Sequence, residues 1–211
     1  MHVTCLTDDA ETFTANVYLA RESGRAVEPG ATLVDVGAMP GIVEVVADRV
    51  STLDSVGLTH RHADHVEQLD AIREAFDPTV YAAEPGDGAT ALEDGDEVLI
   101  GGEPFETVET PGHAPDHLAF VGERAVFTGD VVVYCDGAFE DGSFGRTDLP
   151  GADRETLLAS LDSLLDRLPT TVETMYPGHG PSFEGDVRAV IERARSRAAR
   201  REPKYSESGT P

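Results

Sequence analysis

The chain has 211 residues, of which 40 are Asp or Glu and 16 are Lys or Arg, so its formal net charge at pH 7 is −24. Nucleic-acid binding requires clustered basic side chains, and the one dense cluster, residues 193–201, is expected to form the polar face of a final helix. An acidic surface of this kind repels itself unless counterions screen it. The composition therefore disfavours a nucleic-acid partner and predicts adaptation to high salt.

Cysteines and long apolar runs are scarce. Cys5 and Cys135 are too few for a disulfide framework. No basic stretch followed by an apolar run opens the chain, and no run approaches 18 apolar residues, so we expect no signal peptide, no membrane span and a cytoplasmic location. No Pro-, Gly- or Ser-rich linker interrupts the sequence, which predicts one domain over residues 1–200 and a disordered tail over 201–211.

The first half of the chain alternates short apolar runs with helical patterns. Residues 31–36 and 55–59 are predicted to be buried strands, and a third short strand is expected at 80–82. Between them, apolar residues recur at helical spacing over 42–50 and 69–76. This alternation of strands and helices is typical of a layered α/β domain.

The second half begins with several short strands before helices return. Tight connections are expected at Glu103-Pro104 and Gly122-Glu123. A helix over 153–168 has Asp153 as its predicted N-cap. The strands are predicted at 98–100, 105–109, 118–121, 125–128 and 172–176, and a last helix at 184–200.

Residues 59–65 read Thr-His-Arg-His-Ala-Asp-His and connect a predicted strand to a predicted helix. Loops at the ends of strands carry the functional sites of α/β folds. In an extended loop, side chains two residues apart point the same way, so His60 and His62 can share one metal ion. Asp64 and His65, at the start of the helix, can face a second position. This mixture of imidazoles and a carboxylate suits zinc, iron or manganese.

Three further strand ends carry a histidine or an aspartate directly after a glycine. They are His113 in Thr-Pro-Gly-His, Asp130 in Phe-Thr-Gly-Asp and His179 in Tyr-Pro-Gly-His. Glycine allows the sharp turn that exposes the next side chain. A single loop histidine is more often a surface or core residue than a ligand, but the repeated pattern favours a metal site. We interpret His117 as a packing or ligand-orienting residue, and Asp35 as an orienting residue or a helix cap.

The order His-x-His-x-Asp-His, then a distant His, an Asp and a final His, resembles the metallo-β-lactamase superfamily, and the resemblance extends to about residue 200. It implies a four-layer αββα sandwich with two divalent metal ions between its sheets. The favoured metal is zinc, with iron and manganese as alternatives. The ligands it implies are His60, His62 and His113 for one ion, Asp64, His65 and His179 for the other, and Asp130 bridging both.

Within that superfamily, residues 145–151 (Gly-Arg-Thr-Asp-Leu-Pro-Gly) resemble the glyoxalase II, or hydroxyacylglutathione hydrolase, group. Asn16-Val17-Tyr18-Leu19 resembles the Asn-x-Tyr-Leu strand of the family, and the dispersed acidic residues resemble proteins of halophiles. The resemblance predicts hydrolysis of a small-molecule thioester by a metal-bound hydroxide, with Asp64 orienting the nucleophile and shuttling its proton. Arg146 is expected to pair either with a substrate carboxylate or, in a structural salt bridge, with Asp148 or a neighbouring acid.

Three other functions fit the same residues. A persulfide dioxygenase would use one iron held by His60, His113 and Asp130, an arrangement that resembles a facial triad. A phosphodiesterase or single-strand nuclease would use both metals for phosphoryl displacement. The third alternative is a metal-binding protein without catalysis. The sequence leaves the physiological thiol, the role of the longer segment 134–143 and the oligomeric state open.

Overall fold

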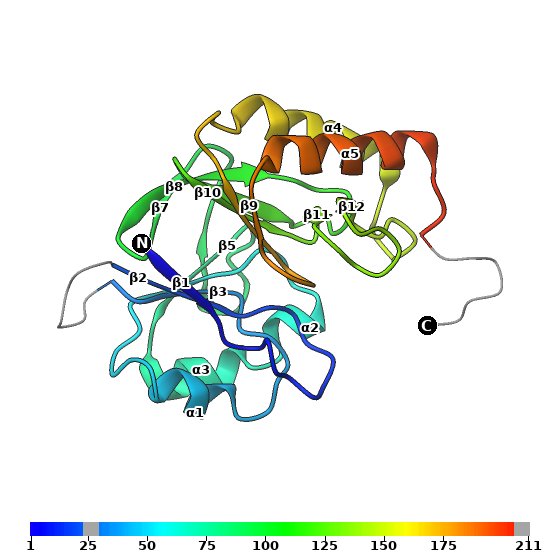
Figure 1. Cartoon of the computed structure of the whole chain (residues 1–211). Helices are drawn as coiled ribbons and strands as arrows, with labels where there is room; N and C mark the ends of the chain where they lie inside the picture. The colour runs from blue at the N-terminus through cyan, green and yellow to red at the C-terminus, as the bar shows by residue number, and fades with distance from the viewer. Residues whose placement is uncertain (23–29, 205–211) are drawn as a thin grey trace.

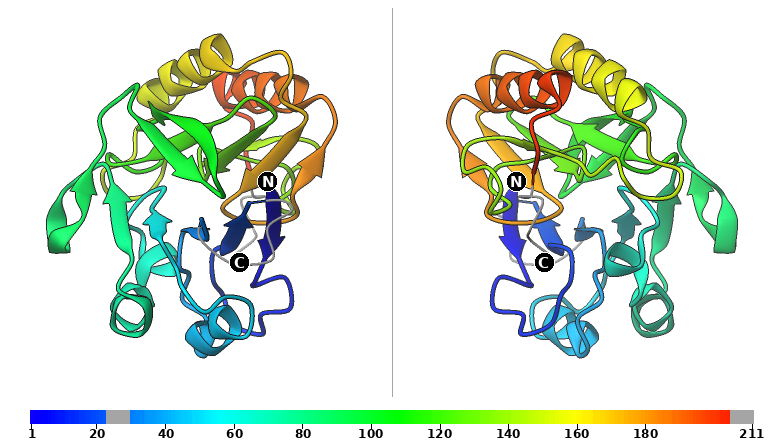
Figure 2. Two further views of the ribbon diagram at one scale, coloured as in Figure 1. Left: turned by 90° about the vertical axis from the view of Figure 1, so that its left-hand side faces the viewer. Right: turned by 90° about the vertical axis from the view of Figure 1, so that its right-hand side faces the viewer.

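The computed structural model describes residues 1–22 and 30–204. Two six-stranded sheets pack face to face, and helices cover the outer face of each (Figures 1 and 2). This arrangement is the predicted αββα sandwich. The helices are α1 (Ile42–Ala47), α2 (Ala63–Val66) and α3 (Leu69–Phe76) beside the first sheet, and α4 (Arg154–Arg167) and α5 (Val187–Arg200) on the second, with a short 3-10 turn η1 (Gly86–Gly88).

The first sheet has its strands in sequence order. Its first three strands are antiparallel, and the third to the sixth run parallel to one another. Parallel strands need crossover connections, which α1 and the α2–α3 pair supply. The strands are β1 (His2–Cys5), β2 (Tyr18–Arg21), β3 (Thr32–Val34), β4 (Ser55–Gly57), β5 (Thr79–Ala82) and β6 (Thr90–Ala91).

The second sheet has the order β14-β13-β10-β9-β8-β7 and is antiparallel except for the β10–β13 pair. Because β10 and β13 are parallel, their carboxyl ends lie at the same edge of the sheet. The strands are β7 (Glu97–Ile100), β8 (Glu103–Glu109), β9 (Leu118–Val121), β10 (Ala125–Gly129), β13 (Thr174–Pro177) and β14 (Phe183–Glu184), and a separate two-stranded ladder pairs β11 (Val132–Val133) with β12 (Ser143–Phe144).

Three buried apolar clusters correspond to the three spaces between the four layers. Between the sheets, Phe105, Phe120 and Phe127 pack against Tyr18. A second cluster joins the first sheet to α1 and α3, and a third joins the second sheet to α4 and α5. Each Å² of apolar surface removed from water stabilises the fold by about 25 cal/mol. Burial of these aromatic and aliphatic side chains therefore holds the sheets and helices together.

Most of the predicted elements are confirmed, including the N-cap of α4, where the Asp153 carboxylate accepts a hydrogen bond from the Thr156 backbone N–H at 2.7 Å. The connection predicted at Glu103-Pro104 is wrong. The turn lies two residues earlier at Gly101-Gly102, both with positive φ, and Pro104 lies within β8. Pro104 is tolerated there because β9 pairs with β8 only from Glu106 onward. No described strand pairs with Pro104 on that side, so the backbone N–H that proline lacks is not needed there.

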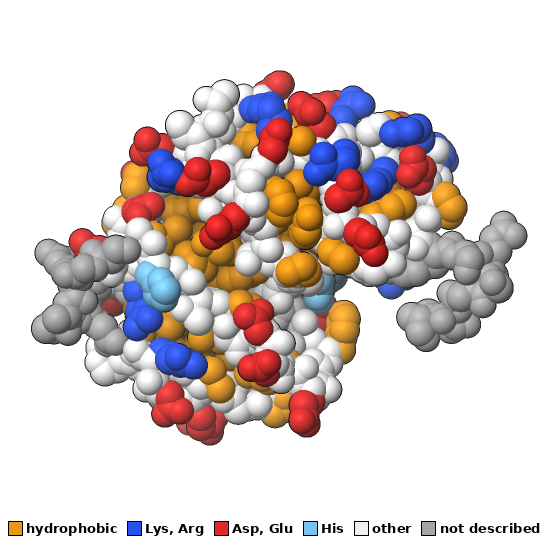
Figure 3. All heavy atoms as spheres, in the orientation of Figure 1, with side chains coloured by type: hydrophobic (Ala, Val, Ile, Leu, Met, Phe, Trp, Pro, Cys, Tyr) orange, Lys and Arg blue, Asp and Glu red, His pale blue; other side chains and the backbone are white. Residues whose placement is uncertain are grey.

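The basic cluster 193–201 lies on α5 and its C-cap, as predicted, and Arg193, Arg195 and Arg197 each pair with an aspartate. Arg193 and Arg197 contact Asp141 at 3.3 and 2.7 Å, and Arg195 contacts Asp162. Figure 3 shows basic and acidic side chains interspersed over the α4 and α5 layer. This part of the surface therefore presents mixed charge.

The end of the described chain contacts the rest of the protein. Arg201, which we expected to begin a disordered tail, is the C-cap of α5, and Lys204 Nζ lies 2.7 Å from Asp136 Oδ2. The remainder of the predicted tail, 205–211, lies outside the described residues. Of the helices in the described ranges, none has both the length and the apolar character needed to cross a bilayer.

Candidate metal centre

The structure brings together all seven side chains that the sequence singled out. They belong to four loops at one end of the strands and to helix α2, and their ligand atoms form overlapping groups within 4.8 Å. Each loop follows a strand whose end was predicted within about two residues: β4, β8, β10 and β13. The side chains are His60, His62, Asp64, His65, His113, Asp130 and His179.

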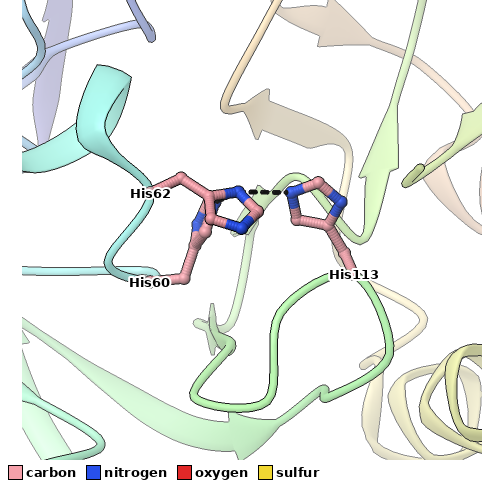
Figure 4. A group of neighbouring side chains, drawn as sticks. All are labelled: His60, His62 and His113. Atoms are coloured by element: carbon pink, nitrogen blue, oxygen red, sulfur yellow. Dashed lines mark hydrogen bonds between the residues drawn. The ribbon is translucent and has the colours of Figure 1, made fainter. Parts of the chain in front are cut away.

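Three histidines meet at one side of the centre. Nδ1 of His62 lies 3.0 Å from Nε2 of His60 and 3.0 Å from Nε2 of His113 (Figure 4). A tetrahedral zinc ion with Zn–N bonds of about 2.0–2.1 Å holds two nitrogens about 3.3 Å apart. One proton on His62 can satisfy only one of its two neighbours, whereas one shared cation would satisfy all three nitrogens.

A second group lies at the other side. Asp64 Oδ2 is 3.0 Å from His179 Nε2, and His65 completes this set. Asp130 stands between the two groups: its Oδ2 is 3.4 Å from His113 Nε2 and 3.5 Å from His179 Nε2, and its Oδ1 is 3.5 Å from His65 Nε2. One carboxylate therefore faces histidines of both groups.

Two buried atoms of this centre have no hydrogen-bond partner among the residues that the structure describes. They are His65 Nε2 and Asp130 Oδ1, which face each other. Leaving a buried polar atom unpaired costs about 1–3 kcal/mol. Gly178 leaves the space beside them open, because a Cβ at this position would lie 2.2 Å from Asp130 Oδ1. Two opposed lone-pair atoms beside an open space fit a bound cation.

The charges of the centre also fit metal ions. Burial lowers the pKa of His60 well below its usual value, with a further effect from neighbouring histidines, and burial lowers that of His113. For Asp130, burial raises the pKa, but the charge and hydrogen bond of His65 outweigh it and hold it well below the usual value. For His65, burial lowers the pKa, but the carboxylates of Asp35 and Asp130 raise it overall. The neutral imidazoles of His60 and His113 and the ionised carboxylate of Asp130 are in the protonation states that bind metals, whereas His65 would release a proton when a metal ion binds.

Asp35 holds two of the histidines in place. Its Oδ2 accepts hydrogen bonds from His65 Nδ1 and from the Thr59 hydroxyl, both at 2.8 Å, and its Oδ1 accepts from the Thr59 N–H at 2.8 Å. Because the Thr59 hydroxyl donates to Asp35, its oxygen accepts from His60 Nδ1 at 3.1 Å. Both histidines therefore carry their proton on Nδ1 and direct Nε2 into the centre, which confirms the orienting role expected for Asp35.

We expect Asp35→Asn to weaken metal binding by about 10–100-fold, the usual effect of removing a partner of a metal-binding histidine. Asparagine tolerates the positive φ of 58° found here but lacks one of the two acceptor oxygens. Competition with a chromophoric chelator would measure the affinity. Asp54→Asn is the control, because Asp54 accepts from the Gly30 backbone outside the centre, and equal affinities for the two variants would refute this role of Asp35.

His117 is not among the converging side chains. Its Nε2 accepts a hydrogen bond from the Asp130 backbone N–H at 3.0 Å, and its Nδ1 lies 2.7 Å from the Thr110 hydroxyl. With both ring nitrogens engaged and the side chain buried, His117 positions the Asp130 loop. This confirms its interpretation as a packing and orienting residue.

Arg146 contributes through its backbone. Its carbonyl accepts a hydrogen bond from His113 Nδ1 at 3.0 Å, which leaves Nε2 of that histidine as the lone-pair nitrogen. Its half-exposed guanidinium makes two hydrogen bonds to Asp148, at 3.0 and 2.8 Å. Of the partners expected for Arg146, the structure shows Asp148.

The loop between β1 and β2 also contacts the centre, which the sequence did not predict. Asn16 donates from Nδ2 to the carbonyls of Pro177 at 2.9 Å and Gly180 at 2.8 Å, on either side of His179. The aromatic ring of Phe13 stacks on the His179 imidazole. The sequence contained one relevant signal, the Asn-x-Tyr-Leu pattern at Asn16, but no spacing connects it with a loop more than 160 residues away.

Comparisons with known proteins agree with this geometry. Residues 81–179 match the model of the metallo-beta-lactamase superfamily. A probable metallo-hydrolase of Streptococcus pyogenes is 31% identical over 180 residues, which cover 71% of this chain and 74% of that protein. A hydroxyacylglutathione hydrolase of Ruegeria pomeroyi is 34% identical over 175 residues, covering 77% of this chain and 62% of the relative.

Solved structures show the same architecture. ETHE1 from Myxococcus xanthus superposes with a TM-score of 0.72 at 27% identity, covering 94% of this chain and 85% of the other. TTHA1623, solved in a di-iron-bound form, gives a TM-score of 0.65 at 29% identity, covering 85% of this chain and 93% of the other. With the αββα sandwich and a His/Asp cluster able to hold metal ions, the chain belongs to the metallo-β-lactamase superfamily and is a metallo-hydrolase.

Proposed function

We propose that this metallo-hydrolase cleaves thioesters, with two zinc ions held by the seven side chains. The observation that carries the proposal is the position of Asp130 between the two groups, since it faces His113 on one side and His65 and His179 on the other. A single ion held by His60, His62 and His113 would leave Asp64 and His179 without a cation. Zinc is part of the proposal and iron is the alternative, since the similar structure TTHA1623 was solved in a di-iron-bound form.

Two divalent cations in such a site lower the pKa of water to near 7 and polarise a carbonyl oxygen. The chain itself supplies Asp64, whose Oδ2 faces His179 at 3.0 Å. Burial raises the pKa of Asp64, but the hydrogen bond from His179 and nearby positive charge lower it overall, so the carboxylate is ionised at neutral pH. We propose that Asp64 takes a proton from the attacking water and passes it to the leaving group.

The reaction balances with water as the only co-reactant. The water oxygen forms a bond to the thioester carbonyl carbon, and the carbon–sulfur bond breaks with its electron pair going to sulfur. The sulfur takes the proton that Asp64 carried, which yields a carboxylic acid and a thiol. This proposal is supported by the similarity to hydroxyacylglutathione hydrolases and by the segment 145–151, whose Arg146 carbonyl orients His113.

A panel of substrates in molar KCl, a medium chosen because of the net charge of −24, tests the proposal. Enzyme loaded with zinc, iron or manganese is given thioesters, a phosphodiester reporter and a persulfide. We expect thioester hydrolysis, lowered by about 10²–10⁴-fold in Asp64→Asn and unchanged in Asp70→Asn, an exposed acid on α3. Cleavage of the phosphodiester without thioester hydrolysis, or oxygen uptake with one iron per chain, would overturn it.

A further inference from the structure

Phe13 lies with most of its surface in solvent beside the metal centre. Its side chain is 79% exposed, and the other large apolar side chain exposed in the described residues is Leu99 at 61%. Exposed apolar residues are common on protein surfaces, so exposure alone assigns no role. Phe13, however, stacks its ring on the His179 imidazole, with centroids 5.4 Å apart and the planes inclined by 16°.

The segment that follows Phe13 is bound to the centre by its backbone. Ala15 N–H donates to the Asp64 carbonyl at 3.0 Å, and Asn16 N–H donates to the Gly178 carbonyl at 2.7 Å. On the other side, the Thr14 hydroxyl accepts from the Ala38 N–H at 2.8 Å. Figure 1 shows this segment, between β1 and β2, passing beside α2. These hydrogen bonds tie the residues next to Phe13 to Asp64 and Gly178, beside His179.

We propose that Phe13 is a specificity-determining residue that packs against an apolar group on the sulfur side of the thioester. The inference rests on the proposed function, because the leaving sulfur has to approach Asp64 to collect its proton. Asp64 lies against His179, and Phe13 covers His179. The substituent on sulfur is thereby brought onto the exposed face of the Phe13 ring.

An aromatic face in this position favours some substituents on the thioester sulfur over others. It removes hydrocarbon or aromatic surface from water when such a group packs on it, and it offers no partner to a carboxylate. The enzyme should therefore prefer thioesters of apolar thiols to thioesters of polar thiols.

Two series of thioesters test the contact. In the first, the acetyl group is kept and the thiol is benzyl thiol or 2-mercaptoethanol; in the second, the thiol is 2-mercaptoethanol and the acyl group is acetyl or phenylacetyl. We expect Phe13→Ala to lower kcat/KM for the benzyl thioester by about tenfold, equivalent to about 1.4 kcal/mol, and to leave the acetyl ester of 2-mercaptoethanol within about twofold of the wild type. The matched control is Leu99→Ala, since β7 supplies none of the seven side chains. Equal losses on all substrates, or a loss confined to the acyl series, would overturn the proposal.

A binding measurement separates this contact from the reaction itself. The chain contains no tryptophan, so Phe13→Trp introduces a single indole at the proposed contact and Leu99→Trp introduces one elsewhere. We expect benzyl thiol to change the fluorescence of metal-loaded Phe13→Trp saturably and at lower concentration than 2-mercaptoethanol, with no such difference in Leu99→Trp. If no thioester is hydrolysed but this difference is found, the proposed function fails and the contact stands. If thioesters are hydrolysed and Phe13→Trp does not distinguish the two thiols, the contact is wrong.

Discussion

Asp130→Asn is expected to lower kcat/KM by about a thousandfold, equivalent to about 4 kcal/mol, and to reduce the bound metal below two ions per chain. The carboxylate of Asp130 lies within 3.5 Å of histidines from both groups. Asparagine keeps the shape of the side chain but removes its charge and one acceptor oxygen, so the two positions can no longer share an anionic ligand. Elemental analysis and steady-state kinetics in high salt would measure both effects.

The control for this variant is Asp162→Asn. Asp162 is an aspartate on α4 paired with Arg195 on α5, and it contributes nothing to the centre. Surface ion pairs contribute about 0–1 kcal/mol, so this variant should keep wild-type metal content and activity. Circular dichroism would verify that both proteins are folded. Asp130→Asn with two metals per chain and wild-type kcat/KM would contradict the assignment of Asp130.

Gly178→Ala is expected to lower kcat/KM by about a hundredfold, because misplacing catalytic groups by about 1 Å has this effect. The added Cβ would lie 2.2 Å from Asp130 Oδ1 and 2.8 Å from His65 Cε1. Contacts this short force one of the two side chains to move away from its partners. Metal affinity, measured by competition with a chelator, should fall together with the activity.

Gly86→Ala is the matched control for this substitution. There the nearest atom to an added Cβ is Nη2 of Arg61 at 3.4 Å, an ordinary contact with the end of a flexible side chain. We expect metal affinity and kcat/KM in this variant to stay within about twofold of the wild type. If Gly178→Ala behaved like Gly86→Ala, the space beside Asp130 would not be needed for a metal ion.

The seven converging residues could be predicted because each is marked by local sequence. His113, Asp130 and His179 each follow a glycine at the end of an apolar run, and the ends of strands in α/β folds meet at one edge. The resemblance to a known family then grouped them into two sets. The structure adds that Asp130 reaches His65 as well as His113 and His179.

The surroundings of the centre could not be predicted in the same way. The hydrogen bond from His113 ends on the backbone carbonyl of Arg146, and every residue type offers the same carbonyl. The stacking of Phe13 on His179 joins positions 166 residues apart, and no periodicity records it. The turn between β7 and β8 was misplaced because Pro104 was taken as a turn residue, whereas the positive φ values belong to Gly101 and Gly102.

The most direct measurement is the number of metal ions bound per chain in the active enzyme. Protein is purified in high salt, dialysed against metal-free buffer and analysed by elemental and native mass spectrometry, before and after removal of metal with a chelator. We expect two divalent ions per chain in wild-type protein, loss of hydrolysis after chelation, and recovery when the second equivalent of metal is restored. Full hydrolytic activity with one ion or none per chain would contradict the account.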